Sequence, residues 1–141
     1  MKRATGKFRP RRRSGAAILE TALILPVLLL LSFGLVEFGH FFYVQHNLTA
    51  AAREGVRTGI ISGRSEGDVA AAVGRAMTAA RLQNSGYTVV TSPANLATAP
   101  EGAEVQVTVR CNWGTVGLRP LKLISASRVV SATAVMRREG T

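Results

Sequence analysis

The chain has 141 residues, which is room for one domain at most, with a formal net charge of +10 and a pI near 11.4. Seven of the 18 basic side chains lie in the first 13 positions, which leaves 11 basic against 8 acidic side chains, a net charge of +3, in the remainder. Because the later arginines are dispersed and lack aromatic stacking partners, the composition argues against a nucleic-acid-binding protein, and the single Cys111 excludes an intramolecular disulfide framework or a cysteine-rich metal site.

Residues 1–15 form a basic leader without an acidic side chain. An excess of lysine and arginine before an apolar stretch predicts a cytoplasmic N-terminus and an exported C-terminal part. The small residues Ser14, Gly15 and Ala16 precede the apolar stretch, so a peptidase cutting there would leave the apolar helix on the mature protein. An ordinary secretory signal has the reverse order, with cleavage after an apolar core of about 7–15 residues.

Residues 16–36 contain a single charged side chain, Glu20. A helix of this length extends about 31 Å, enough to cross the hydrocarbon core of a membrane. A carboxylate within a membrane costs about 2.5–3.5 kcal/mol at the helix centre, so Glu20 either has a use there or reaches back to the cytoplasmic surface. Pro26 removes one backbone hydrogen bond, which predicts a kink or a locally opened turn. Glu37 follows the span, where it is either hydrated at the outer interface or paired with a basic residue of another subunit.

Two stretches of this chain carry a family resemblance. The first reads GAAILETALILPVLLLLSFGLVEFG, from Gly15 to Gly39, and the second reads AAREGVRTG, from Ala51 to Gly59. A glycine before the cleavage point, an acid five residues later and processing ahead of the apolar helix resemble the type IV prepilin pattern. More narrowly, the two stretches resemble the TadE-like family of pilin-like proteins from tight-adherence (Flp) pilus systems.

The resemblance implies cleavage by a prepilin peptidase between Gly15 and Ala16, with Glu20 as the fifth mature residue. In pilins this acid is thought to attract the N-terminal amine of a neighbouring subunit, and such an ion pair removes the cost that each charge has alone in lipid. Family members usually carry an aromatic residue directly after the acid, where this chain has Thr21. The expected subunit contacts are Glu20, Thr21, Pro26 and Glu37.

The remaining chain is divided into an extended N-terminal helix over residues 16–62 and an exported α+β domain over residues 63–141. Gly59 or Gly63 is expected to end the long helix. A second helix is predicted from Glu66 to Leu82, with Ser65 as its N-cap and Asp68 completing a variant of the capping box.

Three strands are predicted over residues 87–91, 103–113 and 129–136, because apolar and polar residues alternate there. The inward positions of the last strand are Val130, Ala132, Ala134 and Met136. The predicted fold class is α+β: a long transmembrane helix continues into a small, pilin-like exported domain, with the second helix packed on a three-stranded antiparallel sheet. Residues 114–124 form a loop that contacts either the membrane or a partner through Leu118, Leu121 and Leu123.

No catalytic constellation is present in the sequence, and His40 and His46 are six residues apart rather than at the i, i+4 spacing of helical metal ligands. We therefore expect a protein that is not an enzyme and has no cofactor, no metal and no small-molecule substrate. His40 is expected to be interfacial and His46 solvated.

The resemblance implies a structural minor pilin or pseudopilin of a Flp-type pilus, which supports adhesion or surface colonisation. Its expected partners are a prepilin peptidase, other pilin subunits, inner-membrane pilus assembly proteins and membrane lipid. It would cross the inner membrane once, with the C-terminal domain periplasmic or extracellular. The alternative is an uncleaved, signal-anchored protein whose exported domain binds a cell-surface partner; under both hypotheses residues 63–141 would be soluble. A membrane-active cationic effector would need an amphipathic basic face, which this chain lacks.

Overall fold

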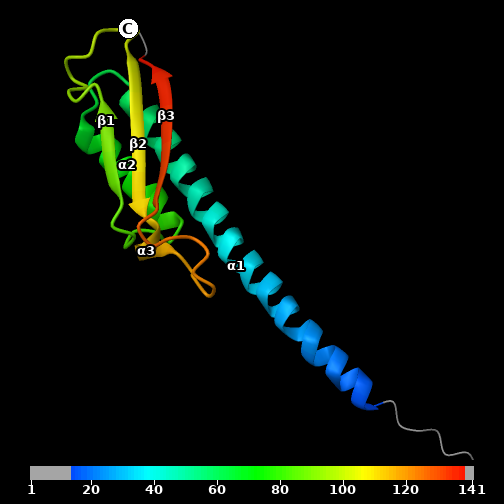
Figure 1. The fold of residues 1–141 in the computed structure, drawn as a ribbon. Helices are drawn as coiled ribbons and strands as arrows, with labels where there is room; N and C mark the ends of the chain where they lie inside the picture. The colour runs from blue at the N-terminus through cyan, green and yellow to red at the C-terminus, as the bar shows by residue number, and fades with distance from the viewer. Residues whose placement is uncertain (1–13, 139–141) are drawn as a thin grey trace, which may run out of the picture.

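The structure of the protein is a computed structural model that describes residues 14–138, so residues 1–13 of the predicted leader lie outside it. Two helices lie on one face of a three-stranded sheet and form the body with it (Figure 1). The first half of the longer helix projects from this body. The predicted α+β class, with a long N-terminal helix, a second helix and a three-stranded antiparallel sheet, is confirmed. The elements are α1 (Ser14–Gly59), α2 (Glu66–Ala79), β1 (Thr88–Ser92), β2 (Glu104–Asn112), α3 (Trp113–Val116) and β3 (Val129–Arg137).

Helix α1 has 46 residues and continues as one helix across Pro26 (Figure 1), where a kink or a locally opened turn was predicted. Two hydroxyl side chains in its first half bond within the helix: Thr21 donates to the carbonyl of Ala17 at 2.9 Å, and Ser32 donates to the carbonyl of Leu28 at 2.8 Å. Such bonds to the preceding turn let polar residues occupy an apolar helix without an unpaired donor.

The two halves of α1 have different surroundings. From residue 44 onward the helix enters the core, where five of its side chains have no exposed surface: Val44, Leu48, Ala51, Ala52 and Val56. The half before residue 37 is exposed to its surroundings. One continuous helix therefore serves both as a projecting element and as part of the core.

Helix α2 begins with the predicted capping box. The backbone N–H of Ser65 donates to the Asp68 carboxylate at 2.9 Å, and the backbone N–H of Asp68 donates to the Ser65 hydroxyl at 3.3 Å. The backbone N–H of Ser65 and the Ser65 hydroxyl, which donates to the Asp68 carboxylate at 3.0 Å, together lower the pKa of that carboxyl. The neighbouring Glu66 accepts a bond from the backbone N–H of Leu96 at 2.6 Å, which lowers its pKa and holds the loop before β2 against the helix. The helix ends at Ala79, earlier than predicted, and Arg81 then has a φ of 55°.

The sheet is antiparallel, with β2 between β1 and β3. Strand β2 alternates strictly, and its four buried side chains are Val105, Val107, Val109 and Cys111. On β3 the predicted inward face is covered only in part: Val130 and Ala132 are buried, Ala134 is half-buried and Met136 is 37% exposed. Met136 lies on the inward face as predicted, since it pairs with the buried Val105, but its side chain is covered only in part, because an alternating pattern does not show where the helices stop covering the strand.

Close packing of α1 against both α2 and β2 depends on two glycines. A Cβ atom at Gly55 would lie 2.7 Å from a methyl of Val73 on α2 and 3.1 Å from a methyl of Val107 on β2. A Cβ atom at Gly59 would lie 3.2 Å from Val69 and 3.3 Å from Val105. The second stretch of the family resemblance thus places small residues where two helices and a strand meet.

Candidate functional site

The N-terminal half of α1, residues 14–36, is here called the stem. Every Leu, Ile, Val and Phe side chain of the stem is exposed, by 45–76%. Among the described residues, this is the one helix that is long and apolar enough to cross a membrane. A continuous apolar surface of this kind is rare on a soluble monomer, so the stem is suited to anchor the chain in a membrane.

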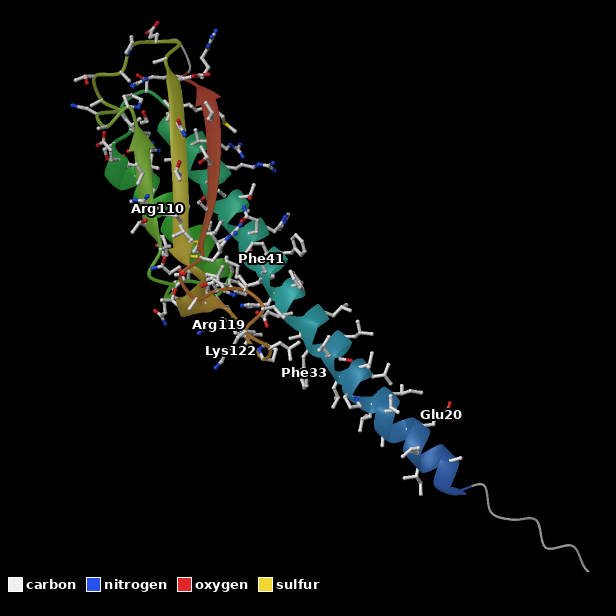
Figure 2. The ribbon with its side chains drawn as sticks, viewed as in Figure 1. Glu20, Phe33, Phe41, Arg110, Arg119 and Lys122 are labelled. Atoms are coloured by element: carbon white, nitrogen blue, oxygen red, sulfur yellow. The ribbon has the colours of Figure 1, made fainter. Side chains whose placement is uncertain are left out.

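The predicted cleavage and assembly residues lie on the exposed surface of the stem. Gly15 and Ala16 are exposed, and no atom comes within 4 Å of the position where a Cβ of Gly15 would be. Glu20 also points outward (Figure 2), and its carboxylate has no hydrogen bond or ion pair within residues 14–138. Thr21 and Pro26 are exposed as well. The structure leaves these five residues accessible to another molecule.

Glu37 has the opposite environment. Its side chain has no exposed surface, and its two carboxylate oxygens accept hydrogen bonds from the backbone N–H groups of Ile124, at 2.9 Å, and Leu121, at 3.2 Å. The expectation of a hydrated carboxylate was therefore wrong, because the loop after α3 folds back over this turn of α1. Glu20 and Glu37 lie about 26 Å apart along the helix, so they form no common site. A contact of Glu37 with another subunit stays a prediction.

The loop held by Glu37 comprises residues 117–125 and is here called the basal loop, since it lies at the base of the body next to the stem (Figure 1). Its start is fixed to α1 by His40, whose Nε2–H donates to the carbonyl of Val116 at 2.8 Å. Beneath it, the buried Trp113 ring packs edge-on against Phe41, with 5.3 Å between ring centroids. Gly117 lies so close to the Trp113 ring that a Cβ atom there would come within 2.5 Å of it. The basal loop is thus attached to the helix at several points.

The remaining titratable candidates do not form a catalytic or metal site in the described part of the chain. The ring of His40 is hydrogen-bonded to Val116 at the start of the basal loop, and His46, six residues later, is exposed. Cys111 is 4% exposed on the inner face of β2, and burial raises the pKa of its thiol, as suits a small apolar residue. No three His, Cys, Asp or Glu side chains of residues 14–138 lie close enough to hold a metal ion.

An apolar groove of about 550 Å³ runs between the stem and the basal loop. We call it the stem groove; its lining residues are Leu30, Leu31, Gly34, Leu35, Phe38, Gly39, Phe42 and Leu123. Leu123 closes one side, with a methyl 3.9 Å from the Cβ position of Gly34. Gly34 is thus in contact with this chain's own loop, while no atom lies within 4 Å of the Cβ position of Gly39.

Sequence reasoning missed the bonds of Glu37, the stem groove and the packing roles of Gly55 and Gly59. The position of Glu37 next to aromatic residues was a sequence signal for its burial. The pattern of α1 alone does not show which distant backbone N–H groups need an acceptor.

Comparison with known families gives one match: the family described as TadE-like protein, over residues 15–57. The matched segment begins at the predicted cleavage glycine, contains the stem except for its first residue and extends into the part of α1 that enters the core. No curated protein and no solved structure matches the chain. Residues 15–57 thus match the TadE-like family, the family that the motifs predicted.

Proposed function

We propose that this protein is a minor pilin or pseudopilin that takes part in assembly of a tight-adherence type IV pilus. One observation carries the proposal: the TadE-like match covers a stem whose large apolar side chains are all exposed and whose Glu20 has no partner within residues 14–138. An exposed apolar helix with one free carboxylate is suited to lateral association within a membrane, where both the surface and the charge need partners.

In the proposed assembly route, the stem enters the inner membrane with the basic leader in the cytoplasm and the body outside. A prepilin peptidase cuts between Gly15 and Ala16, which are accessible at the start of α1. The new α-amine of one subunit then pairs with the Glu20 carboxylate of a neighbour, and this ion pair offsets the cost of each charge in lipid. Other pilin subunits and inner-membrane assembly proteins are the proposed partners.

The body is proposed to be a structural module of the pilus or of its assembly base, with a part in adhesion or surface colonisation. We assign it no catalytic role and no cofactor. The competing hypothesis is a signal-anchored protein that keeps its leader and binds a cell-surface partner through the body. The two hypotheses predict different N-termini for the mature chain.

The test is the intact mass and N-terminal sequence of the full chain after membrane extraction, with and without a co-expressed prepilin peptidase. We expect an N-terminus at Ala16 that depends on the peptidase and is lost in a Gly15→Leu variant. The matched control is Gly39→Ala on the same helix, where a Cβ atom meets nothing within 4 Å and cleavage should be unchanged. A chain that still starts at Met1 with active peptidase present would favour the signal-anchored protein.

A second arm of this experiment tests the role of Glu20 after cleavage. Glu20→Gln keeps the size of the side chain but removes the charge, so it should abolish co-purification with partner pilins. Glu54→Gln, an exposed acid on the same helix, should leave co-purification intact. Equal recovery of partners with both variants would contradict the ion-pair mechanism.

A further inference from the structure

The basal loop combines exposed apolar side chains with positive charge. Leu118 and Leu123 are 55% and 54% exposed. Arg119 directly follows Leu118, and Lys122 directly precedes Leu123. Residues 113–128 contain no acidic side chain. Figure 2 shows Arg119 and Lys122 on the loop beside the stem, and within residues 14–138 neither has a hydrogen bond or ion pair.

The stem groove extends from this loop into the apolar half of α1. Leu30, at its far end, precedes Glu37 by seven residues, which corresponds to about 10 Å of helix. Since the proposed function places residues 16–36 in the membrane, the groove would begin at the outer surface and reach about 10 Å into the hydrocarbon. An occupant of this site must be apolar along the groove and anionic at the end that lies beside Arg119 and Lys122.

We propose that the basal loop binds an anionic phospholipid of the leaflet from which α1 emerges. The lipid phosphate lies between Arg119 and Lys122, and one acyl chain lies in the stem groove against Leu123. A phospholipid supplies both required chemistries in one molecule. This inference rests on the membrane anchoring in the proposed function and adds a lipid site that pilus assembly does not require.

A second copy of this chain is a poorer occupant of the groove. Between residues 30 and 44 its helix offers one acid, Glu37, whose carboxylate is buried and already bonded to its own basal loop. Its other acid near the membrane, Glu20, lies at the opposite end of the stem. The pair of cations would therefore meet no negative charge at this level of a neighbouring helix.

The attachment of the loop to α1 constrains the backbone at Lys122. The bonds from Leu121 and Ile124 to Glu37 fix the backbone on both sides of Lys122, which has a φ of 56°. Such a left-handed conformation is uncommon for a residue with a side chain and is found where surrounding contacts impose it. The lysine is thus held on a constrained turn rather than on a free loop.

The test uses the full chain, one copy per nanodisc, in phosphatidylcholine alone and in phosphatidylcholine with about one third phosphatidylglycerol. Hydrogen–deuterium exchange of residues 117–125 is measured in both. A basic residue near an anionic surface contributes about 1 kcal/mol, a factor of about five, so we expect exchange to slow by at least fivefold with phosphatidylglycerol. Arg119→Gln combined with Lys122→Gln should remove the difference, whereas Arg75→Gln combined with Arg110→Gln, two exposed cations of the body, should keep it.

Leu123→Ser tests the apolar part of the site and should also reduce the lipid-dependent protection, while unchanged exchange in β2 and β3 verifies that each variant is folded. Identical loop exchange of the natural chain in both lipids would overturn the proposal. Protection that appears only with two copies per disc would overturn it as well, in favour of a helix in the groove. Exchange of residues 18–36 distinguishes a failure of the membrane anchoring from a failure of the lipid site. Rapid exchange there contradicts the anchoring itself, whereas a protected stem with a lipid-insensitive loop contradicts only the lipid site.

Discussion

Two acids on one helix show how strongly surroundings determine the role of a residue. Glu20 is exposed among apolar side chains and has no partner in the described chain, while Glu37 is fully buried and accepts two backbone hydrogen bonds. A free carboxylate in an apolar environment indicates a partner in another molecule, whereas a satisfied one indicates an internal support. Position in the sequence predicted the first role and not the second.

Replacement of Glu37 should loosen the basal loop without affecting the rest of α1. In Glu37→Gln the amide accepts one bond, but its NH₂ group faces the second backbone donor, which is then left unpaired at a cost of about 1–3 kcal/mol. We expect the melting temperature in detergent to fall by roughly 3–10 °C. Hydrogen exchange at Leu121 and Ile124 should accelerate, and Glu54→Gln should change neither measurement. Unaltered exchange at both amides would show that the carboxylate does not hold the loop.

Among the elements, α1 has the most demanding packing because it meets α2 and β2 at the same point. The meeting point is Gly55, where the missing side chain lets Val73 and Val107 approach the helix backbone. Ala51 and Ala52 on the preceding turn are also fully buried. The small residues of the TadE-like segment thus have a structural explanation in the body, separate from any role of the stem in assembly.

Gly55→Ala should destabilise the body even though alanine is the better helix former. The added methyl would lie 2.7 Å from Val73, and overpacking of this kind costs about 1–3 kcal/mol, more than the gain of about 1 kcal/mol in helix propensity. Gly39→Ala on the same helix meets no atom within 4 Å and should not lower stability. Thermal unfolding of the two variants in detergent measures the difference. Equal melting temperatures would mean that α2 can move away from α1 without loss.

The sequence predicted the elements well because their patterns are local. The capping box at Ser65 and Asp68, the strict alternation of β2 and the apolar run of the stem each lie within a few turns of chain. The exposure of Met136 and the bonds of Glu37 were not predictable in this way. Both depend on where a distant segment lies in space, and neither strand alternation nor helical periodicity contains that information.

At the scale of the whole molecule, the body has one core to which α1 and the sheet contribute together. Val44, Leu48 and Val56 of α1 share this core with Met77 of α2 and Trp113. On the far side of the helix, Gln45 donates to the carbonyl of Ser131 on β3 at 3.0 Å. The boundary predicted after residue 62 therefore divides a single core, because residues on both sides of it pack together.

Two truncations test this shared core. Residues 36–141, which keep Glu37 and the buried half of α1, should be soluble and unfold cooperatively. Residues 63–141 lose Val44, Leu48 and Val56, each worth about 1.5–3 kcal/mol when buried, out of a typical total stability of 5–15 kcal/mol. Contrary to the expectation from sequence, this shorter chain should not fold. A native-like near-ultraviolet spectrum of Trp113 in residues 63–141 would show that the sheet and α2 are sufficient.

The contact between α1 and β3 also determines the order of events during biosynthesis. Helix α1 leaves the ribosome before β3, and 86 positions separate Gln45 from Ser131, the residues that meet. Since the core needs both elements, it closes only after β3 has been synthesised. Until then β2 lacks one neighbour, and its open edge and the apolar residues of α1 are available to chaperones, proteases or another nascent chain. Synthesis of β3, the third strand of the sheet in chain order, is therefore the step that allows the body to fold.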